Sequence, residues 1–264
     1  MIVDSTGHLF ITGSHAGIKS GTAVFKVALT APGGPSGTGT ATLSPTFLDN
    51  ASATDGKGGG TVKLSLGDVD SSAIVPQSSP RFGGSFVIDD QTALQLVFAG
   101  NIDSGTGLTA LKTPFGLDDI RWATSDGGML YVVDNGGTKP GASAVYKVTG
   151  PFKTGTVLAS NDSVSSEIVK VNLTTGGLTP FVRGLTTTKG LVYVNASGSV
   201  TQLPVAGSAA APAAPASKPA AIHKPSSSAG GSNTATIVIV IVVVLLLLGG
   251  GGYTMMRRRP SPAA

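Results

Sequence analysis

The side chains of this chain that could do chemistry are mostly oxygen donors, because it has no cysteine and only three histidines. Asp118, Asp134 and Asn135 are the candidates for holding a divalent cation such as Ca²⁺, which prefers clustered carboxylate and amide oxygens. Three acidic pairs widen the choice of ligands: Asp68/Asp70, Asp89/Asp90 and Asp118/Asp119. None of these pairs has the spacing of a loop that supplies six calcium ligands, so turn capping and solubility are the simpler roles.

Histidine and glutamate add little to this set. His8 and His15 are seven residues apart across an expected turn, where two imidazoles could bind a metal, but surface histidines without a metal are commoner. Glu167 is the only glutamate, which leaves little material for paired-carboxylate catalysis. Without cysteine, a thiolate metal site and a cysteine nucleophile are excluded. We therefore expect no catalytic residue and no cofactor, with Ca²⁺ or another divalent metal as the alternative.

Asparagine shows a more suggestive pattern. Four of the seven asparagines begin an Asn-x-Ser/Thr sequence, the acceptor motif for N-linked glycans. The four expected acceptors are Asn50, Asn161, Asn172 and Asn195. In an organism that glycosylates in the secretory pathway, they predict that this region faces outward.

The distribution of charge excludes one class of partner. Residues 1–205 carry 13 Lys and Arg against 14 acidic residues, so this region is nearly neutral. The positive surplus comes from Lys218, Lys224 and the run 257–259. A nucleic-acid-binding protein would place its basic patch on the folded domain. We therefore expect no nucleic-acid partner.

The elements that must position these side chains are indicated by an internal repeat. Residues 7–27 align with residues 128–148 without a gap, at a constant offset of 121. Gly7-His-Leu-Phe-Ile-Thr-Gly-Ser falls on Gly128-Met-Leu-Tyr-Val-Val-Asp-Asn, and Ala23-Val-Phe-Lys-Val falls on Ala144-Val-Tyr-Lys-Val. A weaker third copy begins at Gly190 and matches Tyr193 to Tyr131. Each copy predicts a glycine-bounded turn, a short strand, a polar loop and a second strand.

Short strands are expected elsewhere in the first 205 residues too. Runs rich in β-branched and aromatic residues are separated by Gly-containing turns such as Asp126-Gly127 and Asn135-Gly136. The further strand candidates are residues 61–66, 85–88, 93–99, 167–173 and 178–182. No run before residue 235 has a convincing helical pattern, so the fold class is all-β.

The repeat unit resembles a blade of the β-propellers that include NHL-repeat and SMP-30-like proteins. The motifs that carry the resemblance are Phe115-Gly-Leu-Asp-Asp-Ile, Asp126-Gly-Gly-Met-Leu-Tyr-Val-Val-Asp-Asn and Ala144-Val-Tyr-Lys-Val. It implies a propeller of roughly four or five blades in residues 1–205, and, for the enzymes of that group, metal-binding residues at the propeller mouth. Asp118, Asp134 and Asn135 are the nearest positions to such a set. A β-sandwich of the cell-surface kind is the alternative fold.

The C-terminal part predicts a stalk and a membrane anchor. Residues 206–234 contain 20 Ala, Pro or Ser among 29 positions, a composition typical of a disordered linker. Residues 235–256 follow, 22 residues without a charge that include twelve consecutive Ile, Val and Leu. As a helix this segment would be about 33 Å long, enough to cross a hydrocarbon core of about 30 Å.

Three arginines predict the orientation of this anchor. Arg257, Arg258 and Arg259 directly follow the apolar segment, and short arginine-rich flanks stay on the cytoplasmic side. The tail 257–264 is then cytoplasmic, and residues 1–234 lie outside, at the plasma membrane. The start of the chain shows no signal peptide and opens in the middle of a repeat unit, so we expect the N-terminus of the ectodomain to be truncated. The alternative is a tail-anchored chain with a cytosolic domain, which would carry three arginines across the membrane against the charge bias.

These features lead to two functional hypotheses. The first is a single-pass ectodomain, residues 1–205, that binds an extracellular protein or glycan and is held off the bilayer by the stalk. The second is a membrane-tethered propeller enzyme, of lactonase or hydrolase type, with a divalent metal at the propeller mouth. The presence of a stoichiometric metal in the purified protein distinguishes the two.

Overall fold

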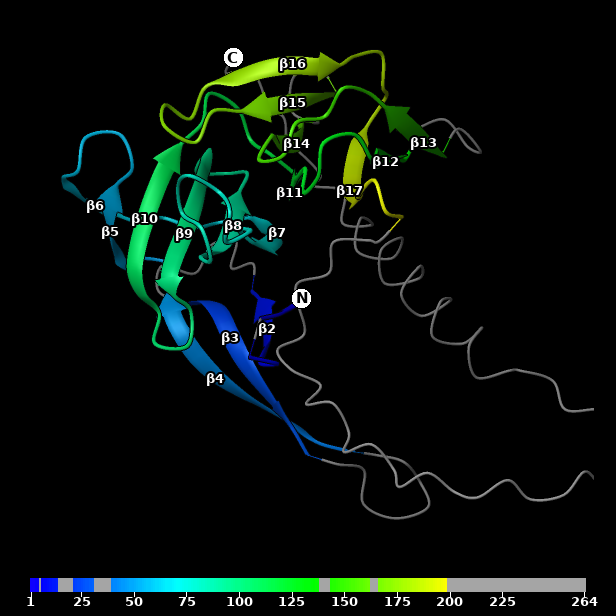
Figure 1. The fold of residues 1–264 in the computed structure, drawn as a ribbon. Coiled ribbons are helices and arrows are strands. Elements are labelled where there is room, and N and C mark those ends of the chain that lie inside the picture. Colours follow the sequence, from blue (N-terminus) through cyan, green and yellow to red (C-terminus); the bar gives the residue numbers. More distant parts are fainter. Residues whose placement is uncertain (5, 14–20, 31–38, 138–142, 162–165, 199–264) are drawn as a thin grey trace, which may run out of the picture. The chain divides into compact units, whose positions relative to one another are not determined.

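The computed structural model describes residues 1–4, 6–13, 21–30, 39–137, 143–161 and 166–198. All of them belong to the first of the two units into which the chain divides, residues 1–210 and 211–264. The described residues form an all-β fold whose four sheets are arranged in a propeller-like ring (Figure 1). The expected fold class and the propeller-like architecture are thereby confirmed, and the β-sandwich alternative is not observed.

The four sheets are named here A to D. Sheet A has the order β1 (Ile2–Val3), β2 (Leu9–Thr12), β3 (Thr22–Leu29), β4 (Ala41–Leu48). Sheet B has the order β6 (Thr61–Lys63), β5 (Ser52–Asp55), β10 (Thr106–Lys112), β9 (Gln95–Asn101), β8 (Phe86–Asp90), β7 (Val69–Ile74). Sheet C has the order β11 (Asp119–Trp122), β14 (Val157–Asn161), β15 (Glu167–Val171), β16 (Leu178–Val182). Sheet D has the order β13 (Ala144–Thr149), β12 (Met129–Asp134), β17 (Thr188–Val194).

Antiparallel neighbours dominate every sheet, and β5 with β10 is the one parallel pair among the described strands. The five additional strand candidates correspond to β6, β8, β9, β15 and β16, with ends that differ by a few residues. The third repeat copy does not begin a new blade. Its strand β17 pairs with β12, so it completes the sheet of the second copy.

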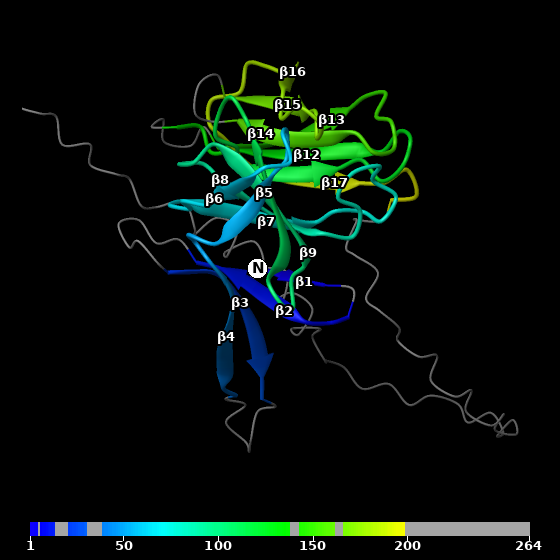
Figure 2. The same cartoon turned by 90° about the vertical axis from the view of Figure 1, so that its left-hand side faces the viewer.

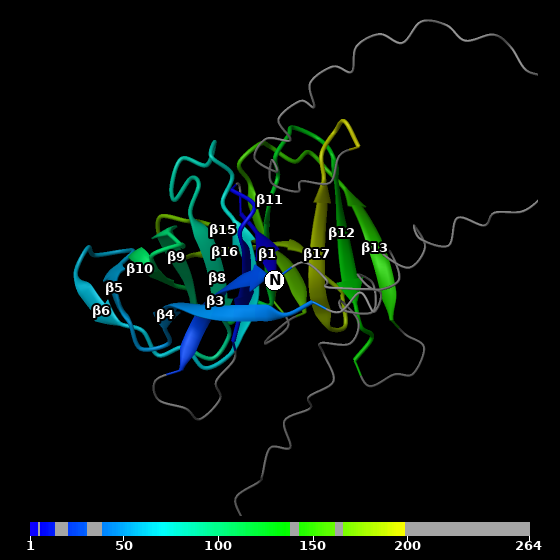
Figure 3. The same ribbon diagram turned by 90° about the horizontal axis from the view of Figure 1, so that it is seen from below.

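Figures 2 and 3 show the sheets from two further directions. The apolar core of the described residues lies in three layers between successive sheets. Strand β8 shows how one sheet contributes side chains to two of these layers. Phe86 and Ile88 belong to the layer shared with sheet A, whereas Val87 belongs to the layer shared with sheet C. Successive side chains of a strand point to opposite faces. Sheets B and C are therefore buried on both faces, and β8 and β14 are buried at every position.

Three hairpin turns are capped in the same way. The side-chain oxygen of Asp4, Asp90 or Asn172 accepts hydrogen bonds from backbone N–H groups two to four residues later, at 2.8–3.2 Å. Asp and Asn do this because their short side chains reach back over the turn that follows. In the third hairpin, Gly176 has a φ of +71°, and a Cβ there would collide with the carbonyl oxygen of Lys112 on β10. This position therefore requires glycine.

The stalk 206–234, the anchor 235–256 and the tail 257–264 lie outside the described residues. In the described part of the chain, no helix is long and apolar enough to span a membrane.

Candidate functional site

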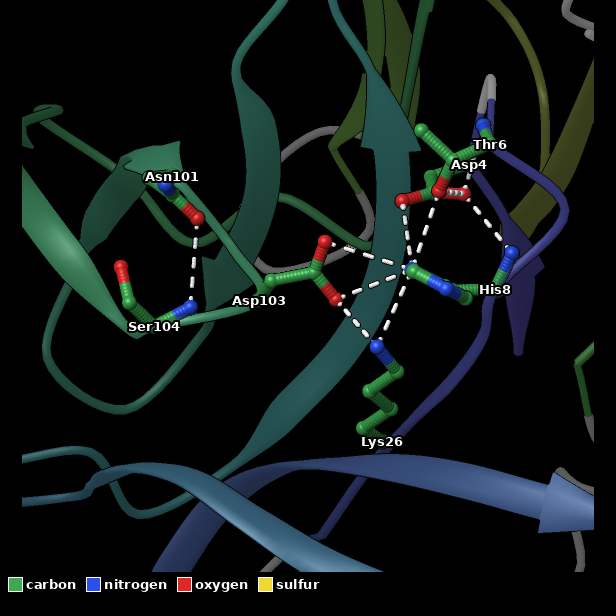
Figure 4. A network of polar contacts seen from close by, with 7 residues as sticks. All are labelled: Asp4, Thr6, His8, Lys26, Asn101, Asp103 and Ser104. Atoms are coloured by element: carbon green, nitrogen blue, oxygen red, sulfur yellow. Dashed lines mark hydrogen bonds and ion pairs between the residues drawn. The ribbon is translucent and has the colours of Figure 1, made fainter.

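A polar network joins sheet A to sheet B at the β1–β2 turn (Figure 4). His8 Nδ1 lies 3.0 Å from Asp103 Oδ1 and 3.7 Å from Asp4 Oδ2. Lys26, on β3, places its Nζ 2.7 Å from Asp103 Oδ1 and 3.1 Å from His8 Nδ1. Asp103 is in the β9–β10 turn, so residues separated by most of a hundred positions meet here.

The two aspartates of this network have different environments. Asp4 is buried, and its Oδ1 accepts hydrogen bonds from the Thr6 N–H and hydroxyl and from the His8 N–H. The side chain of Asp103 is 41% exposed. The hydrogen bond from Lys26 is the main reason that the pKa of Asp103 lies below its ordinary value. Asp103 therefore stays ionised well into acidic pH.

This network has the ligand types of a metal site. Asp4, His8 and Asp103 are the one group of three metal-binding side chains in the ranges that the structure covers, with ligand atoms within 4.8 Å of one another. The ammonium group of Lys26 already supplies a positive charge to Asp103, at hydrogen-bond distance. A divalent cation would therefore have to compete with Lys26.

Two buried carboxyl groups lie near each other, one on a strand of sheet B and one on a strand of sheet C. Asp89, on β8, accepts a 2.7 Å hydrogen bond from the Ser71 N–H through Oδ1. The Ser71 side chain also acts on Asp89 through a hydrogen bond that lowers its pKa. Asp119, on β11, accepts hydrogen bonds from the Ile120 N–H at 2.8 Å and the Leu191 N–H at 2.7 Å. It also forms a 2.6 Å ion pair with Arg121.

Burial raises the pKa of both groups, because a low-dielectric interior disfavours the charged form. The pKa of Asp89 is well above its ordinary value of 3.8, first through burial and then through the charge of Asp119. The pKa of Asp119 is also raised, since burial outweighs Arg121 and the backbone hydrogen bonds. Among the described residues, Asp119 has an ion pair with Arg121, and Asp89 has none.

Replacing Asp89 by asparagine should stabilise the protein at pH 8 by roughly 1–3 kcal/mol, because the amide removes a buried negative charge that the low-dielectric interior and the charge of Asp119 disfavour. The folded chain holds the Asp89 proton more tightly than the unfolded chain does. The stabilisation by this proton is complete below the unfolded pKa of 3.8 and is lost as the pH rises through the folded pKa. The advantage of Asp89→Asn should therefore shrink toward pH 4.

The measurement is urea unfolding of the full-length chain in detergent at several pH values, followed by the fluorescence of Trp122. This residue is the chain's single tryptophan and is 4% exposed. Asp126→Asn, at an exposed position, is the matched control. Equal stability of Asp89→Asn and the parent chain at pH 8 would contradict the prediction.

The expected metal ligands accept hydrogen bonds from side chains or from the backbone of neighbouring segments. Asp118 Oδ1 accepts hydrogen bonds from Gln91 Nε2 and Lys189 Nζ, both at 3.0 Å. The Asp134 carboxylate accepts three backbone N–H groups, and Asn135 Oδ1 accepts the Gly137 N–H at 3.0 Å. The described metal-capable group contains neither Asp118 nor Asp134.

The two residues of an acidic pair have different structural roles, as Asp89 and Asp90 show. Asp90 caps the β8–β9 turn and additionally accepts the N–H groups of Gly67 at 3.0 Å and Asp68 at 3.2 Å. Its neighbour Asp89 is the buried acid described above. Side chains of adjacent residues in a strand point to opposite faces, so a sequence pair of this kind does not form a joint site. His15 lies outside the described residues.

The four glycan acceptors differ in exposure. Asn50 and Asn172 are exposed and Asn195 is half-buried. Asn161 is fully buried at the end of β14, and the rest of its acceptor motif lies outside the described residues. Its burial does not favour a glycan, and glycosylation of Asn161 stays a prediction. Arg257, Arg258 and Arg259 lie outside the described residues.

A shallow depression of about 350 Å³ lies beside one acceptor, between sheets B and C. Its lining includes Arg81, Asn172, Leu173 and Thr174. The Arg81 guanidinium donates to the backbone carbonyls of Leu173 and Thr174. Arg81 therefore uses its hydrogen-bonding capacity to tie the two sheets together.

Two residue groups were missed by the sequence analysis: Asp103 with Lys26, and the buried acid Asp89 as a group separate from Asp90. The first depends on contacts between distant segments and leaves no local signal. For Asp89, the signal was its position inside the apolar run 86–90. Comparison with protein-family models, with curated proteins and with solved structures found no match for this chain.

Proposed function

We propose that this chain is a single-pass membrane protein whose propeller-like region acts as a binding module at the cell surface. The observation that carries the proposal is the uncharged segment 235–256, followed directly by three arginines. A segment of this length and hydropathy is stable across a bilayer, and the arginines favour a cytoplasmic tail. The module, residues 1–205, is then outside, and the partner is an extracellular protein or glycan.

The geometry of the described region supports a binding role. Its aspartates are used mainly to hold turns and neighbouring strands, as with Asp4, Asp90 and Asp134. Rigid sheets that carry exposed turns are a common scaffold for binding surfaces. The motifs at 115–120, 126–135 and 144–148 support a relation to NHL-repeat and SMP-30-like propellers. Exposed acceptors at Asn50 and Asn172 agree with an outward location.

The second candidate is a membrane-tethered propeller enzyme with a divalent metal. The observation that favours it is the group formed by Asp4, His8 and Asp103. Metal analysis of the full-length protein, purified without chelator, separates the two functions. One equivalent of a divalent ion, lost in the His8→Ala variant, would favour the enzyme. A protein without bound metal supports the binding module.

The membrane proposal is tested on the full-length chain expressed in cells. We expect the protein to remain in the membrane fraction after extraction with alkaline carbonate, since roughly twelve central aliphatic residues each favour insertion. Protease added to intact cells should digest residues 1–234 and spare an epitope placed after Ala264. Release by carbonate would exclude the anchor. Digestion of the C-terminal epitope with protection of the N-terminal region would reverse the orientation.

A further inference from the structure

Asn135 is followed directly by Gly136, just after β12, and this pair of residues has a chemistry of its own. The peptide nitrogen that follows an asparagine can attack the side-chain amide carbon. A bond then forms between the Gly136 nitrogen and Asn135 Cγ, and the bond from Cγ to the side-chain nitrogen breaks. That nitrogen leaves as ammonia with the proton of the Gly136 N–H. Water opens the resulting succinimide ring to aspartate or isoaspartate. Glycine favours the attack, because it has no Cβ to obstruct it.

The structure holds the attacking nitrogen away from this reaction. The Gly136 N–H donates a 3.1 Å hydrogen bond to Asp134 Oδ1, and Gly136 is buried. Asp134 is 2% exposed, and its carboxylate also accepts the N–H groups of Thr186 and Thr187, both at 2.8 Å. Because these two contacts fix the carboxylate, Gly136 cannot turn toward Asn135 without breaking its own hydrogen bond.

Asn135 itself is held at three points. Its Oδ1 accepts the Gly137 N–H at 3.0 Å, and its backbone N–H donates to the Thr187 carbonyl at 3.0 Å. Its carbonyl oxygen accepts a 2.9 Å hydrogen bond from the Ser143 hydroxyl. Ring closure needs the reacting nitrogen and carbon in an aligned, near-attack geometry. The three hydrogen bonds of Asn135 oppose the torsional changes that lead to it.

Asp134 could act on the Gly136 N–H in two opposite ways, as an acceptor that holds it or as a base that removes its proton. Hydrogen bonds from Thr186, Thr187 and Gly136 leave the pKa of Asp134 below its ordinary value, although burial opposes them. A carboxylate of that kind is a very weak base, and a peptide N–H gives up its proton only in strong alkali. General-base catalysis is poor when the pKa of the base is far below the operating pH. The holding role is therefore favoured.

We propose that Asn135 is a site of spontaneous deamidation, and that Asp134 protects it by holding the Gly136 nitrogen. Isoaspartate at position 135 would add a methylene group to the backbone, and either product would place a second carboxylate beside Asp134. Like charges at close range repel, so the modified chain loses part of the contact between Asp134 and residues 186–187. Deamidation thus marks molecules in which this contact has opened. The proposal does not depend on the membrane anchor or on the binding role.

The test compares deamidation at Asn135 in the full-length parent chain, Asp134→Ala and Val132→Ala, incubated in detergent at pH 8 and followed by mass spectrometry of the peptide. Val132 is fully buried on the same strand, so its truncation lowers stability and leaves Asp134 in place. Urea is adjusted until the fluorescence of Trp122 reports the same folded fraction in both variants. Each rate is divided by the rate of the same chain in concentrated urea, which removes the local effect of residue 134.

We expect the corrected rate in Asp134→Ala to exceed that in Val132→Ala by about tenfold, because one hydrogen bond to a charged acceptor no longer has to break. Equal rates would overturn the proposal, since folding alone would then protect Asn135. A slower rate in Asp134→Ala would also overturn it, because Asp134 would then be acting as the base.

A second measurement uses the parent chain alone and serves if Asp134→Ala does not fold. Hydrogen exchange of the Gly136 N–H and deamidation of Asn135 are followed together over a series of low urea concentrations. Both rates should rise in proportion, because each requires the Gly136 N–H to leave Asp134. Deamidation at the unfolded rate while the Gly136 N–H is still protected from exchange would overturn the proposal.

Discussion

Replacing Phe98 by alanine should lower the free energy of unfolding by about 3–5 kcal/mol. Phe98 is 1% exposed in the layer between sheets B and C, and its ring stacks on that of Phe82 with centroids 3.8 Å apart. Phe82 holds a positive φ of 60°, and the guanidinium of Arg81 lies 4.5 Å from its ring centroid. Truncation at Phe98 thus leaves a cavity beneath a stack that also anchors Arg81 to sheet C.

The loss is measured by urea unfolding of the full-length chain in detergent, with the fluorescence of Trp122 as the probe. Trp122 belongs to the same core layer as Phe98 and reports on it directly. Phe115→Ala is the matched control, because this phenylalanine is 39% exposed and its removal leaves little cavity. If the two variants lose equal stability, the layer between sheets B and C is not packed as described.

Replacing Asp134 by alanine should cost about 3 kcal/mol or more, because three backbone donors lose a charged acceptor. The carboxylate accepts the N–H groups of Thr186 and Thr187 at 2.8 Å and of Gly136 at 3.1 Å. It therefore joins the end of β12 to the segment that leads into β17. Burial by itself raises the pKa of Asp134, but the three hydrogen bonds outweigh it and leave the pKa below its ordinary value of 3.8.

The lowered pKa of Asp134 determines how the effect of Asp134→Ala depends on pH. A carboxyl group with a lowered folded pKa stabilises the protein above the unfolded pKa of 3.8 and loses that contribution as the pH falls through the folded pKa. The difference between Asp134→Ala and the parent chain should thus be full at pH 7 and shrink in strong acid. Asp126→Ala is the control, since hydrogen bonds from Thr154 and Lys153 lower the pKa of Asp126 to about 2 but its side chain is 60% exposed. A similar loss in both variants would show that the carboxylate charge, rather than its buried position, is responsible.

The chain was classified as all-β from its sequence because the signals are local. Alternating and continuous apolar runs predicted strands such as β8, β9 and β16, and Gly-containing pairs predicted the turns. The repeat at residues 7–27 and 128–148 predicted blades, which the structure shows as a propeller-like ring. Strands with little apolar pattern escaped prediction. In β4 (Ala41–Leu48), six of eight residues are exposed, so no buried face marks it in the sequence.

The candidate sites could be predicted only in part, because a sequence shows which acids are adjacent but not which of them meet. Asp118 and Asp134 were singled out for metal binding, and the structure adds that they accept hydrogen bonds from Lys189 and Thr186. Metal binding by these two residues stays a prediction. Asp103 is recognised as a candidate ligand only in the tertiary structure, where the β9–β10 turn places it beside His8.

The sequence by itself determined the strand-forming segments, the repeat, the sequons and the uncharged segment 235–256, since each depends on residues close together in the chain. Tertiary structure alone decided which face of each strand is covered, and therefore that Asn161 is buried while Asn50 is exposed. It also decided that, in the described part of the chain, Asp119 forms an ion pair with Arg121 while Asp89 is buried near Asp119 without one. The burial and the ion pairing of a residue depend on its contacts with segments that are distant in the sequence. Local sequence patterns do not show which segments those are.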